Sequence, residues 1–204
     1  MILYGGGMRS RVFWAVVCCF LGVAGCGAKE PLDVSRGDVG REWAVAPAVA
    51  AHPEVEQIVA QARGLWLEDV CSSPKEAVAL LDHALELAPG YPAALALRGL
   101  ARSELGQREQ AFDDLTEALR HTPTAQMYAW RGLVSLRGDM SGAARRDAEY
   151  ALQKDGRQPD AWNVLGLVEA REGDNKNACM SLERGCENGR CRPLEAARQE
   201  GICK

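Results

Sequence analysis

The sequence predicts an all-α fold in which four helix hairpins of similar length stack in a row and a short helix caps the last one. Alanine and leucine, both strong helix formers, dominate the chain from about residue 55 onward, whereas aromatic residues make up only 6% of it. Small residues recur at a period close to 34 residues, and the apolar residues between them follow a helical spacing. Together these observations favour stacked helix pairs over a β-sandwich or an unrelated helical bundle.

The first 25 residues are predicted to be a secretory signal peptide. Two arginines precede an apolar run over residues 12–24, which is shorter than the roughly 20 residues that a membrane span needs. The small residues 23–25, Val-Ala-Gly, directly precede Cys26 and resemble the bacterial lipobox. That resemblance implies a lipid on Cys26 and, from the glycine that follows it, a place in the cell envelope on the periplasmic face of the outer membrane. An ordinary signal peptide with an incidental cysteine is the alternative.

The rest of the chain divides into three parts. Residues 26–53 contain glycine, proline and charged residues without a sustained period, which is typical of a flexible tether. Residues 54–190 carry the four repeats, and residues 191–204 are predicted to form a disulfide-linked C-terminal cap.

Three series of small residues mark the repeats. The first series is a glycine followed by leucine, and its members lie 35, 33 and 34 residues apart. The second and third series are alanines, apart from one glycine, at intervals of 34, 33 and 34 residues. Their members are Gly64, Gly99, Gly132 and Gly166; Ala77, Ala111, Ala144 and Ala178; and Ala84, Ala118, Ala151 and Gly185. Three registers that move together over four copies predict four structural repeats.

The second repeat shows why these positions are small. An apolar stripe with a spacing of three or four residues runs over residues 94–105, as on one face of a helix. Gly99 and Ala111 would let two helix backbones approach closely, which larger side chains would prevent. Gly106 is expected to end the first helix and Pro123 to follow the second. One such hairpin cannot bury its stripe alone, so neighbouring hairpins must stack.

These residues resemble the tetratricopeptide repeat (TPR), a helix–turn–helix unit, over about residues 57–190. The resemblance implies a right-handed TPR superhelix, an α-solenoid, in which the first helix of each repeat lines a concave face that binds a partner. Two turns depart from the family's pattern. The first carries an extra residue near Cys71, and the third reaches Gly138 one residue early.

The resemblance also implies which residues face the groove. By repeat, these positions are Gln61, Leu65, Glu68 and Asp69; Ala93, Ala96, Leu100, Ser103 and Glu104; Gln126, Ala129, Leu133, Leu136 and Arg137; and Asp160, Asn163, Leu167, Ala170 and Arg171. They form a row of leucines and a rim that changes from acidic to basic along the repeats, which would suit an extended or helical peptide bound in one direction. The alternative is that the leucines only seal one repeat against the next and the charges form a solvated rim. Of the clamp by which chaperone adaptors of this family bind a carboxylate, only Asn163 has the right residue type.

Four cysteines cluster near the C-terminus, where an exported chain is expected to form disulfides. Cys179 and Cys186 lie two helical turns apart, about 10 Å by the helical rise, which is too far for a direct bridge. A hairpin with its turn at residues 187–190 favours the nested pairs Cys186–Cys191 and Cys179–Cys203 over the remaining connectivity.

A zinc site is the alternative use of these four cysteines, although their spacing contains no C-x-x-C pair. The same absence disfavours redox catalysis. The remaining cysteine, Cys71, is interpreted as a small buried apolar residue or, alternatively, as one half of an intermolecular disulfide.

Nucleic-acid binding and catalysis are both disfavoured. The net charge is −4, which gives no electrostatic footprint for DNA or RNA. The three histidines lie outside any Ser/His/Asp or Cys/His constellation, and the neighbouring acids Asp113 and Asp114 are interpreted as part of a solvated helix face. We therefore expect no enzyme, no cofactor and no metal.

Two functional hypotheses remain. The first is a lipid-anchored, non-catalytic TPR scaffold that binds a peptide or an envelope protein through its concave face, as an assembly factor for an envelope complex would. The second is a structural or redox-responsive envelope protein that acts through its cysteine-rich C-terminus.

Overall fold

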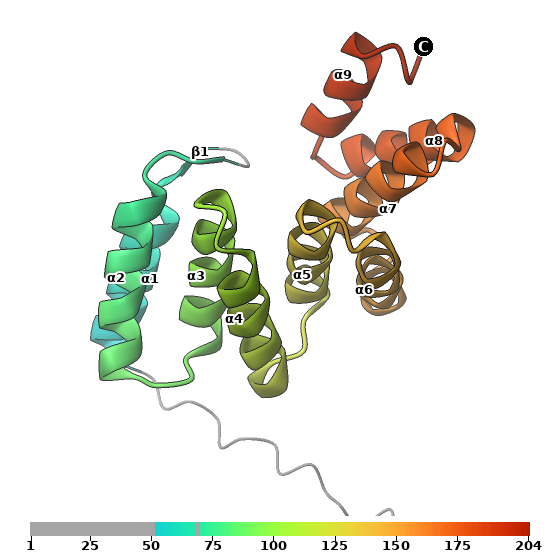
Figure 1. Ribbon diagram of the computed structural model, residues 1–204. Helices are drawn as coiled ribbons and strands as arrows, with labels where there is room; N and C mark the ends of the chain where they lie inside the picture. Colours follow the sequence, from blue (N-terminus) through green and yellow to red (C-terminus); the bar gives the residue numbers. More distant parts are fainter. Residues whose placement is uncertain (1–51, 68–69) are drawn as a thin grey trace, which may run out of the picture. The chain divides into compact units, whose positions relative to one another are not determined.

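The computed structural model describes residues 52–67 and 70–204, and these residues fold as helix hairpins (Figure 1). The helices are α1 (Pro53–Arg63), α2 (Pro74–Leu87), α3 (Pro92–Glu104), α4 (Arg108–His121), α5 (Ala125–Arg137), α6 (Ser141–Lys154), α7 (Pro159–Arg171), α8 (Asn175–Glu187) and α9 (Arg192–Gln199). The predicted signal peptide, the lipidation residue Cys26, the tether up to residue 51 and the rim residues Glu68 and Asp69 lie outside the described residues.

The helices pack as the four predicted repeats. Within each repeat the first helix contacts the second, in the pairs α1–α2, α3–α4, α5–α6 and α7–α8. The first helices of successive repeats also contact one another, α3 with α5 and α5 with α7, and α9 packs on α8 and α7. The predicted fold class, a TPR solenoid of four repeats with a C-terminal capping helix, is confirmed. In the described part of the chain, no helix is both long and apolar enough to span a membrane.

The small residues lie where two helices meet. A Cβ placed on Gly99 would lie 2.9 Å from the carbonyl oxygen of Ala111, and one on Gly166 would lie 2.7 Å from Cγ of Leu182. These separations are shorter than side-chain carbons tolerate, so a larger residue would push the two helices of the repeat apart. The alanines of the second and third series are fully buried in all of their copies. The 34-residue period is therefore a record of close contacts between helices.

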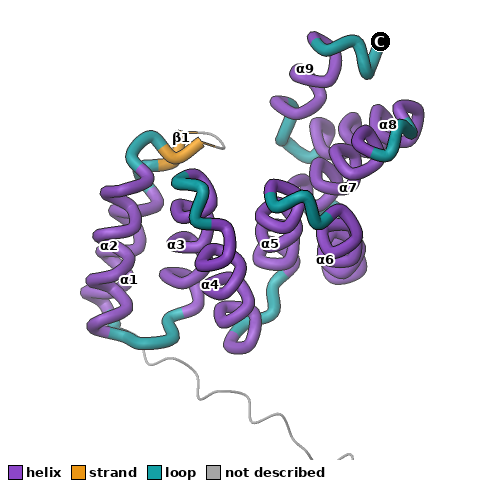
Figure 2. The backbone as a smooth tube through the Cα atoms, viewed as in Figure 1, coloured by secondary structure: helices purple, strands orange, loops and turns teal. Residues whose placement is uncertain are grey.

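The first repeat departs from the others. Its helix α1 ends at Arg63, so Gly64 caps the helix and does not lie between two helices as Gly99 does. The chain then forms two short antiparallel strands, β1 (Trp66–Leu67) and β2 (Val70–Cys71), in which Trp66 lies opposite Cys71 (Figure 2). The extra residue expected in this turn is thus accommodated by a β-hairpin, and the expected equivalence of Gly64 with the later glycines is wrong.

The third turn also differs from its expected form. Gly106 and Gly173 adopt positive φ angles of 77° and 83° after the first helices of the second and fourth repeats. In the third repeat the positive φ, 59°, belongs to Asp139, whereas Gly138 has a φ of −89°. Aspartate is among the few residues that tolerate this left-handed conformation, which explains how the turn forms although its glycine comes one residue early.

Two buried ion pairs join the helices of the second and third repeats. Nε and Nη2 of Arg98 donate to the two carboxylate oxygens of Asp114 at 2.9 and 2.7 Å, and Arg131 binds Asp147 in the same way. Arg102 donates a further hydrogen bond to Asp114 at 2.7 Å. The interpretation of Asp114 as a solvated residue is therefore wrong, because two arginines from the preceding helix compensate its burial.

Candidate functional site

A groove of about 920 Å³ is lined by one face of α3, α5 and α7, by the β-hairpin and by α9. Its apolar lining comes mainly from Leu100, Leu133 and Leu167, one from each of the three helices, with Trp130 beside them. The further lining residues used below are Arg63, Trp66, Val70, Glu104, Gln126, Arg137, Asp160, Asn163, Ala170, Leu182, Arg190, Arg192, Pro193, Ala196, Ala197, Glu200 and Ile202. The groove combines an apolar floor with charged residues, as ligand sites commonly do.

Three of the four predicted leucines occupy this groove. Leu100, Leu133 and Leu167 are half-buried, so part of each side chain remains open to a guest. Leu133 and Leu167 also pack against the core formed around Leu136 and Val164. Both interpretations of the leucine row therefore hold for these residues, which seal the repeats and line the groove. Leu65 instead packs against the core of the first repeats.

Several other predicted groove positions lie elsewhere. Ala96, Ser103, Ala129 and Leu136 are buried in the helix packing, so their side chains offer no surface to a guest. Ala93 packs against the first core cluster, Gln61 is exposed outside the lined volume, and Arg171 reaches toward the third turn. The positions that do line the groove are Leu100, Glu104, Gln126, Leu133, Arg137, Asp160, Asn163, Leu167 and Ala170.

The expected charge gradient does not appear in the described part of the rim, because its charges are paired. Glu104 and Arg137 hold equivalent positions in successive repeats, and Nη2 of Arg137 lies 2.8 Å from a carboxylate oxygen of Glu104. In the same way Arg171 donates to the carbonyl oxygen of Leu136 at 2.8 Å and to Asp139 at 2.9 Å. These contacts join one repeat to the next, so they neutralise the rim charges that were expected to orient a peptide.

Trp130 and Asp160 form a polar centre in the groove. Nε1 of Trp130 donates a hydrogen bond to Oδ2 of Asp160 at 3.2 Å, and Nε of Arg190 lies 3.4 Å from Oδ1. Burial raises the pKa of the Asp160 carboxyl above its ordinary value, while the hydrogen bond from Trp130 acts in the opposite direction. The sequence analysis missed Trp130, although its position three residues before Leu133 places both side chains on one helix face.

Asn163 lies at the edge of this centre and is almost fully buried. Its Nδ2 donates to the carbonyl oxygen of Arg190 at 3.2 Å, which ties α7 to the segment that leads into α9. Its Oδ1 has no hydrogen-bond partner among the described residues. The amide thus positions the end of the groove.

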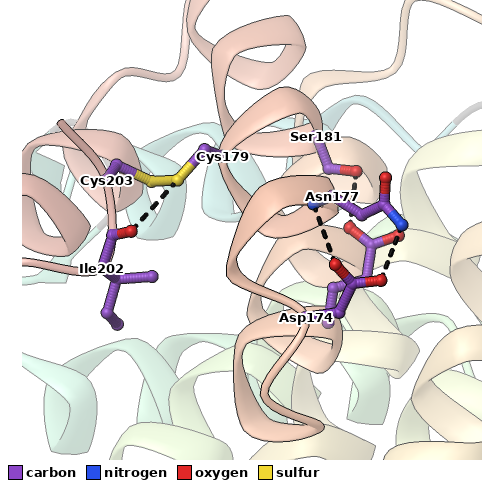
Figure 3. The surroundings of a disulfide bond; sticks show 7 residues. Asp174, Asn177, Cys179, Ser181, Ile202 and Cys203 are labelled. Carbon is purple, nitrogen blue, oxygen red and sulfur yellow. Dashed lines mark hydrogen bonds between the residues drawn. A yellow bond between two sulfur atoms is a disulfide. The ribbon is translucent and has the colours of Figure 1, made fainter.

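The C-terminal cap carries two disulfides in the structure. Cys179 is bonded to Cys203 with a Cα–Cα distance of 5.5 Å (Figure 3), and Cys186 is bonded to Cys191 with a Cα–Cα distance of 3.9 Å. In the described part of the chain, no three histidine, cysteine or acidic side chains gather as a metal site. Sequence reasoning did not foresee that this cap would line the groove, because nothing local in residues 192–202 indicates which surface they meet.

Cys71 is the cysteine of the described residues that forms no disulfide, and it is buried in the β-hairpin. Burial raises the pKa of its thiol, and a hydrogen bond with the backbone of Ser73 opposes that effect. A buried, protonated thiol is a poor nucleophile, so Cys71 acts as a small apolar residue of the core.

Comparisons with known proteins agree with this fold. No protein-family profile matches the chain. Human Tetratricopeptide repeat protein 13 is 29% identical over 103 residues, a segment that is 50% of this chain and only 12% of that protein.

Two solved structures resemble the chain in three dimensions. A chain of the APC/C hetero-tetramer Cut9–Hcn1 matches with a TM-score of 0.59 and 19% identity, over 69% of this chain and 26% of that one. MamA residues 41 to the end, from Desulfovibrio magneticus RS-1, match with a TM-score of 0.54 and 20% identity, over 68% of this chain and 77% of that one. At these identities the likeness shows the fold alone. The repeat series, the structure and the human relative together support the TPR family for this chain.

Proposed function

We propose that this protein is a non-catalytic TPR scaffold that binds a peptide, or a segment of another protein, in the groove between α3, α5, α7 and α9. The observation that carries the proposal is the groove of about 920 Å³ with half-buried leucines on its floor. Half-buried leucines at equal positions in successive repeats form a row of apolar contacts, which is what the apolar side chains of a peptide need. Burying them against a guest contributes about 25 cal/mol for each Å² of apolar surface removed from water.

The charges of the groove support a guest with mainly apolar anchors. Glu104 and Arg137 satisfy each other, and Asp160 is held by Trp130 and Arg190. A guest therefore meets paired charges that favour neither a strongly acidic nor a strongly basic segment. The human relative and the Cut9–Hcn1 assembly agree with a scaffold, since the second is a TPR-like chain found in a hetero-tetramer.

The same proposal places the scaffold in the cell envelope, held by a lipid on Cys26 at the periplasmic face of the outer membrane. The lipobox-like residues 23–25 and the short apolar run before them support this placement. A tethered scaffold with an apolar groove would suit an assembly factor for an envelope complex.

Peptide selection tests the groove. The full chain, purified in detergent, is used to select dodecapeptides from a phage-displayed library, and the best peptide is measured by fluorescence anisotropy. Leu133→Glu is expected to weaken its binding at least about tenfold, because a charge on the apolar floor must be desolvated. The matched control is Leu87→Glu, at an exposed leucine of α2 outside the groove, which should bind as the parent does. Unchanged binding by a helical Leu133→Glu protein would reject the groove as the site.

Membrane fractionation tests the anchor. The Cys26→Ala variant is expected in the soluble fraction of cells, whereas the parent stays with the outer membrane. If both proteins remain membrane-bound, the lipid anchor is wrong, and the groove proposal stands on its own experiment.

A further inference from the structure

One wall of the groove is the capping helix α9 and the residues next to it. Pro193, Ala196 and Glu200 line the groove from α9 and its C-cap, and Ile202 follows from the last residues of the chain. The opposite faces belong to α3, α5 and α7, which are held in the repeat packing. The shape of the groove therefore depends on where α9 lies.

By itself α9 is weakly held. It has eight residues, which is well below the length at which an isolated helix is stable in water. Its buried side chains are Leu194 and Ala197, which pack with Leu182 and Cys203 in a small cluster. This cluster is smaller than the cores between the repeats, so apolar packing alone holds the wall loosely.

The disulfides fasten α9 to α8 at both of its ends. Cys191 precedes the first residue of α9 and is bonded to Cys186, while Cys203 follows the helix and is bonded to Cys179. The sulfur of Cys179 also lies 3.4 Å from the carbonyl oxygen of Ile202, a contact rather than a donated hydrogen bond because a bridged sulfur has no hydrogen (Figure 3).

Helix α8 offers a firm support that does not depend on these sulfurs. The carboxylate of Asp174 accepts hydrogen bonds from the backbone and side-chain nitrogens of Asn177, at 3.2 and 2.6 Å, and so caps the start of α8 (Figure 3). Ser181 donates to Glu169 of α7 at 2.7 Å. Breaking the disulfides should therefore release α9 while α7 and α8 stay packed.

We propose that the α9 wall is a redox-controlled part of the groove: reduction of Cys179–Cys203 by a dithiol releases residues 192–204 and weakens guest binding. This inference rests on the proposed function, because it concerns affinity at the same groove. The bond between Cys179 and Cys203 closes a separation of 24 residues, against 5 for Cys186–Cys191. On the chain-entropy estimate the longer loop makes the first bond about tenfold more effective in holding the wall.

The exchange balances as a transfer of two electrons and two protons from the dithiol to the protein. Cys179 is half-buried and Cys203 is buried, so the first thiolate of the dithiol attacks the sulfur of Cys179 and the thiolate of Cys203 leaves. The second thiol of the dithiol then attacks the mixed disulfide. The products are two protein thiols, on Cys179 and Cys203, and the oxidised dithiol.

Hydrogen exchange tests the release of the wall in the full chain. In the background of Cys186→Ser with Cys191→Ser, dithiothreitol can reduce only Cys179–Cys203 of the described pairs. We expect the amides of residues 192–203 to exchange about a hundredfold faster after reduction, with α5, α6 and α7 unchanged. The pair Cys179→Ser with Cys203→Ser should show the fast exchange without any reductant. Unchanged protection of residues 192–203 in both experiments would overturn the proposal.

Peptide affinity tests the consequence for the groove. The probe is the dodecapeptide selected on the oxidised protein, measured before and after reduction and on both cysteine pairs. If the wall is released nine times in ten, affinity falls about tenfold on reduction and for Cys179→Ser with Cys203→Ser. Cys186→Ser with Cys191→Ser, while oxidised, should bind nearly as the parent does. Equal affinity in the oxidised and reduced proteins would reject the redox control and leave the scaffold function intact. Failure to select any peptide would instead reject the scaffold function itself, and with it this control.

Discussion

Asn163 on α7 and Gly185 on α8 face each other in the fourth repeat, at positions where the second and third repeats each have two alanines. A Cβ added to Gly185 would collide with Oδ1 of Asn163. The corresponding pairs, Ala96 with Ala118 and Ala129 with Ala151, are fully buried. The larger amide is thus accommodated by the loss of a methyl group on the facing helix, and the amide is free to bind the carbonyl oxygen of Arg190.

This relationship predicts a rescue between two substitutions. Gly185→Ala alone should lower the free energy of unfolding by about 1–3 kcal/mol, because the new methyl group overlaps the amide. Adding Asn163→Ala should recover at least half of that loss by restoring the alanine pair of the other repeats. Urea unfolding followed by circular dichroism measures both, and a double variant less stable than Gly185→Ala would contradict the pairing.

The neighbouring acids of α4 should differ sharply when replaced. Asp114→Asn is expected to lower the free energy of unfolding by about 3 kcal/mol, because it leaves Arg98 and Arg102 partly buried without their carboxylate. Asp113 is exposed, and Asp113→Asn is the matched control, with an effect within about 0.5 kcal/mol. Equal effects of the two substitutions in urea unfolding would show that the Asp114 pairs contribute nothing.

The buried carboxyl of Asp160 predicts a pH dependence of stability. Burial raises its pKa in the folded state, so the folded protein binds this proton more tightly than the unfolded chain does. The contribution of Asp160 to stability is therefore complete below the ordinary aspartate pKa of about 4 and is lost as the pH rises through the raised pKa. Asp160→Asn removes the titration and should gain stability relative to the parent above this window.

Urea midpoints measured at a series of pH values check that slope. The difference between Asp160→Asn and the parent should grow with pH, while the difference for Asp113→Asn should stay flat. A constant difference for Asp160→Asn across the series would mean that the carboxyl has the same pKa in the folded and unfolded states.

The turns predict opposite responses to the same substitution at neighbouring glycines. Gly106 has a positive φ, and Gly106→Ala should lower the free energy of unfolding by about 1 kcal/mol because a Cβ disfavours that conformation. Gly138 has a negative φ, and Gly138→Ala should change it by less than about 0.5 kcal/mol. Thermal unfolding of the two variants decides the matter, and a larger loss at Gly138 would place the left-handed residue of the third turn wrongly.

The repeat architecture could be predicted because its cause is local. Wherever two backbones approach within contact distance the chain needs glycine or alanine, and such residues as Gly99 and Ala111 then recur with every copy. The same reasoning failed at Gly64, where the residue type is unchanged but the helix has ended. A small residue is necessary for close packing, but it does not prove that packing occurs.

The groove was predicted less completely. Leu100, Leu133 and Leu167 were placed correctly within the lined volume, because they repeat with the helices that carry them. Ala96 and Ala129 were not, since adjacent positions on one helix differ in burial by only a small rotation. Trp130 and the residues of α9 escaped notice because they do not recur in the other repeats.

The sequence by itself determined the helices, their number in the described region and the order in which they stack, since these depend on residue spacing along the chain. Only the tertiary structure decided which charges are free. Asp113 and Asp114 are chemically identical neighbours, yet one faces water and the other lies between two arginines. The partner of a charge, like the wall that α9 adds to the groove, depends on side chains that meet across helices, and no pattern within one helix contains that information.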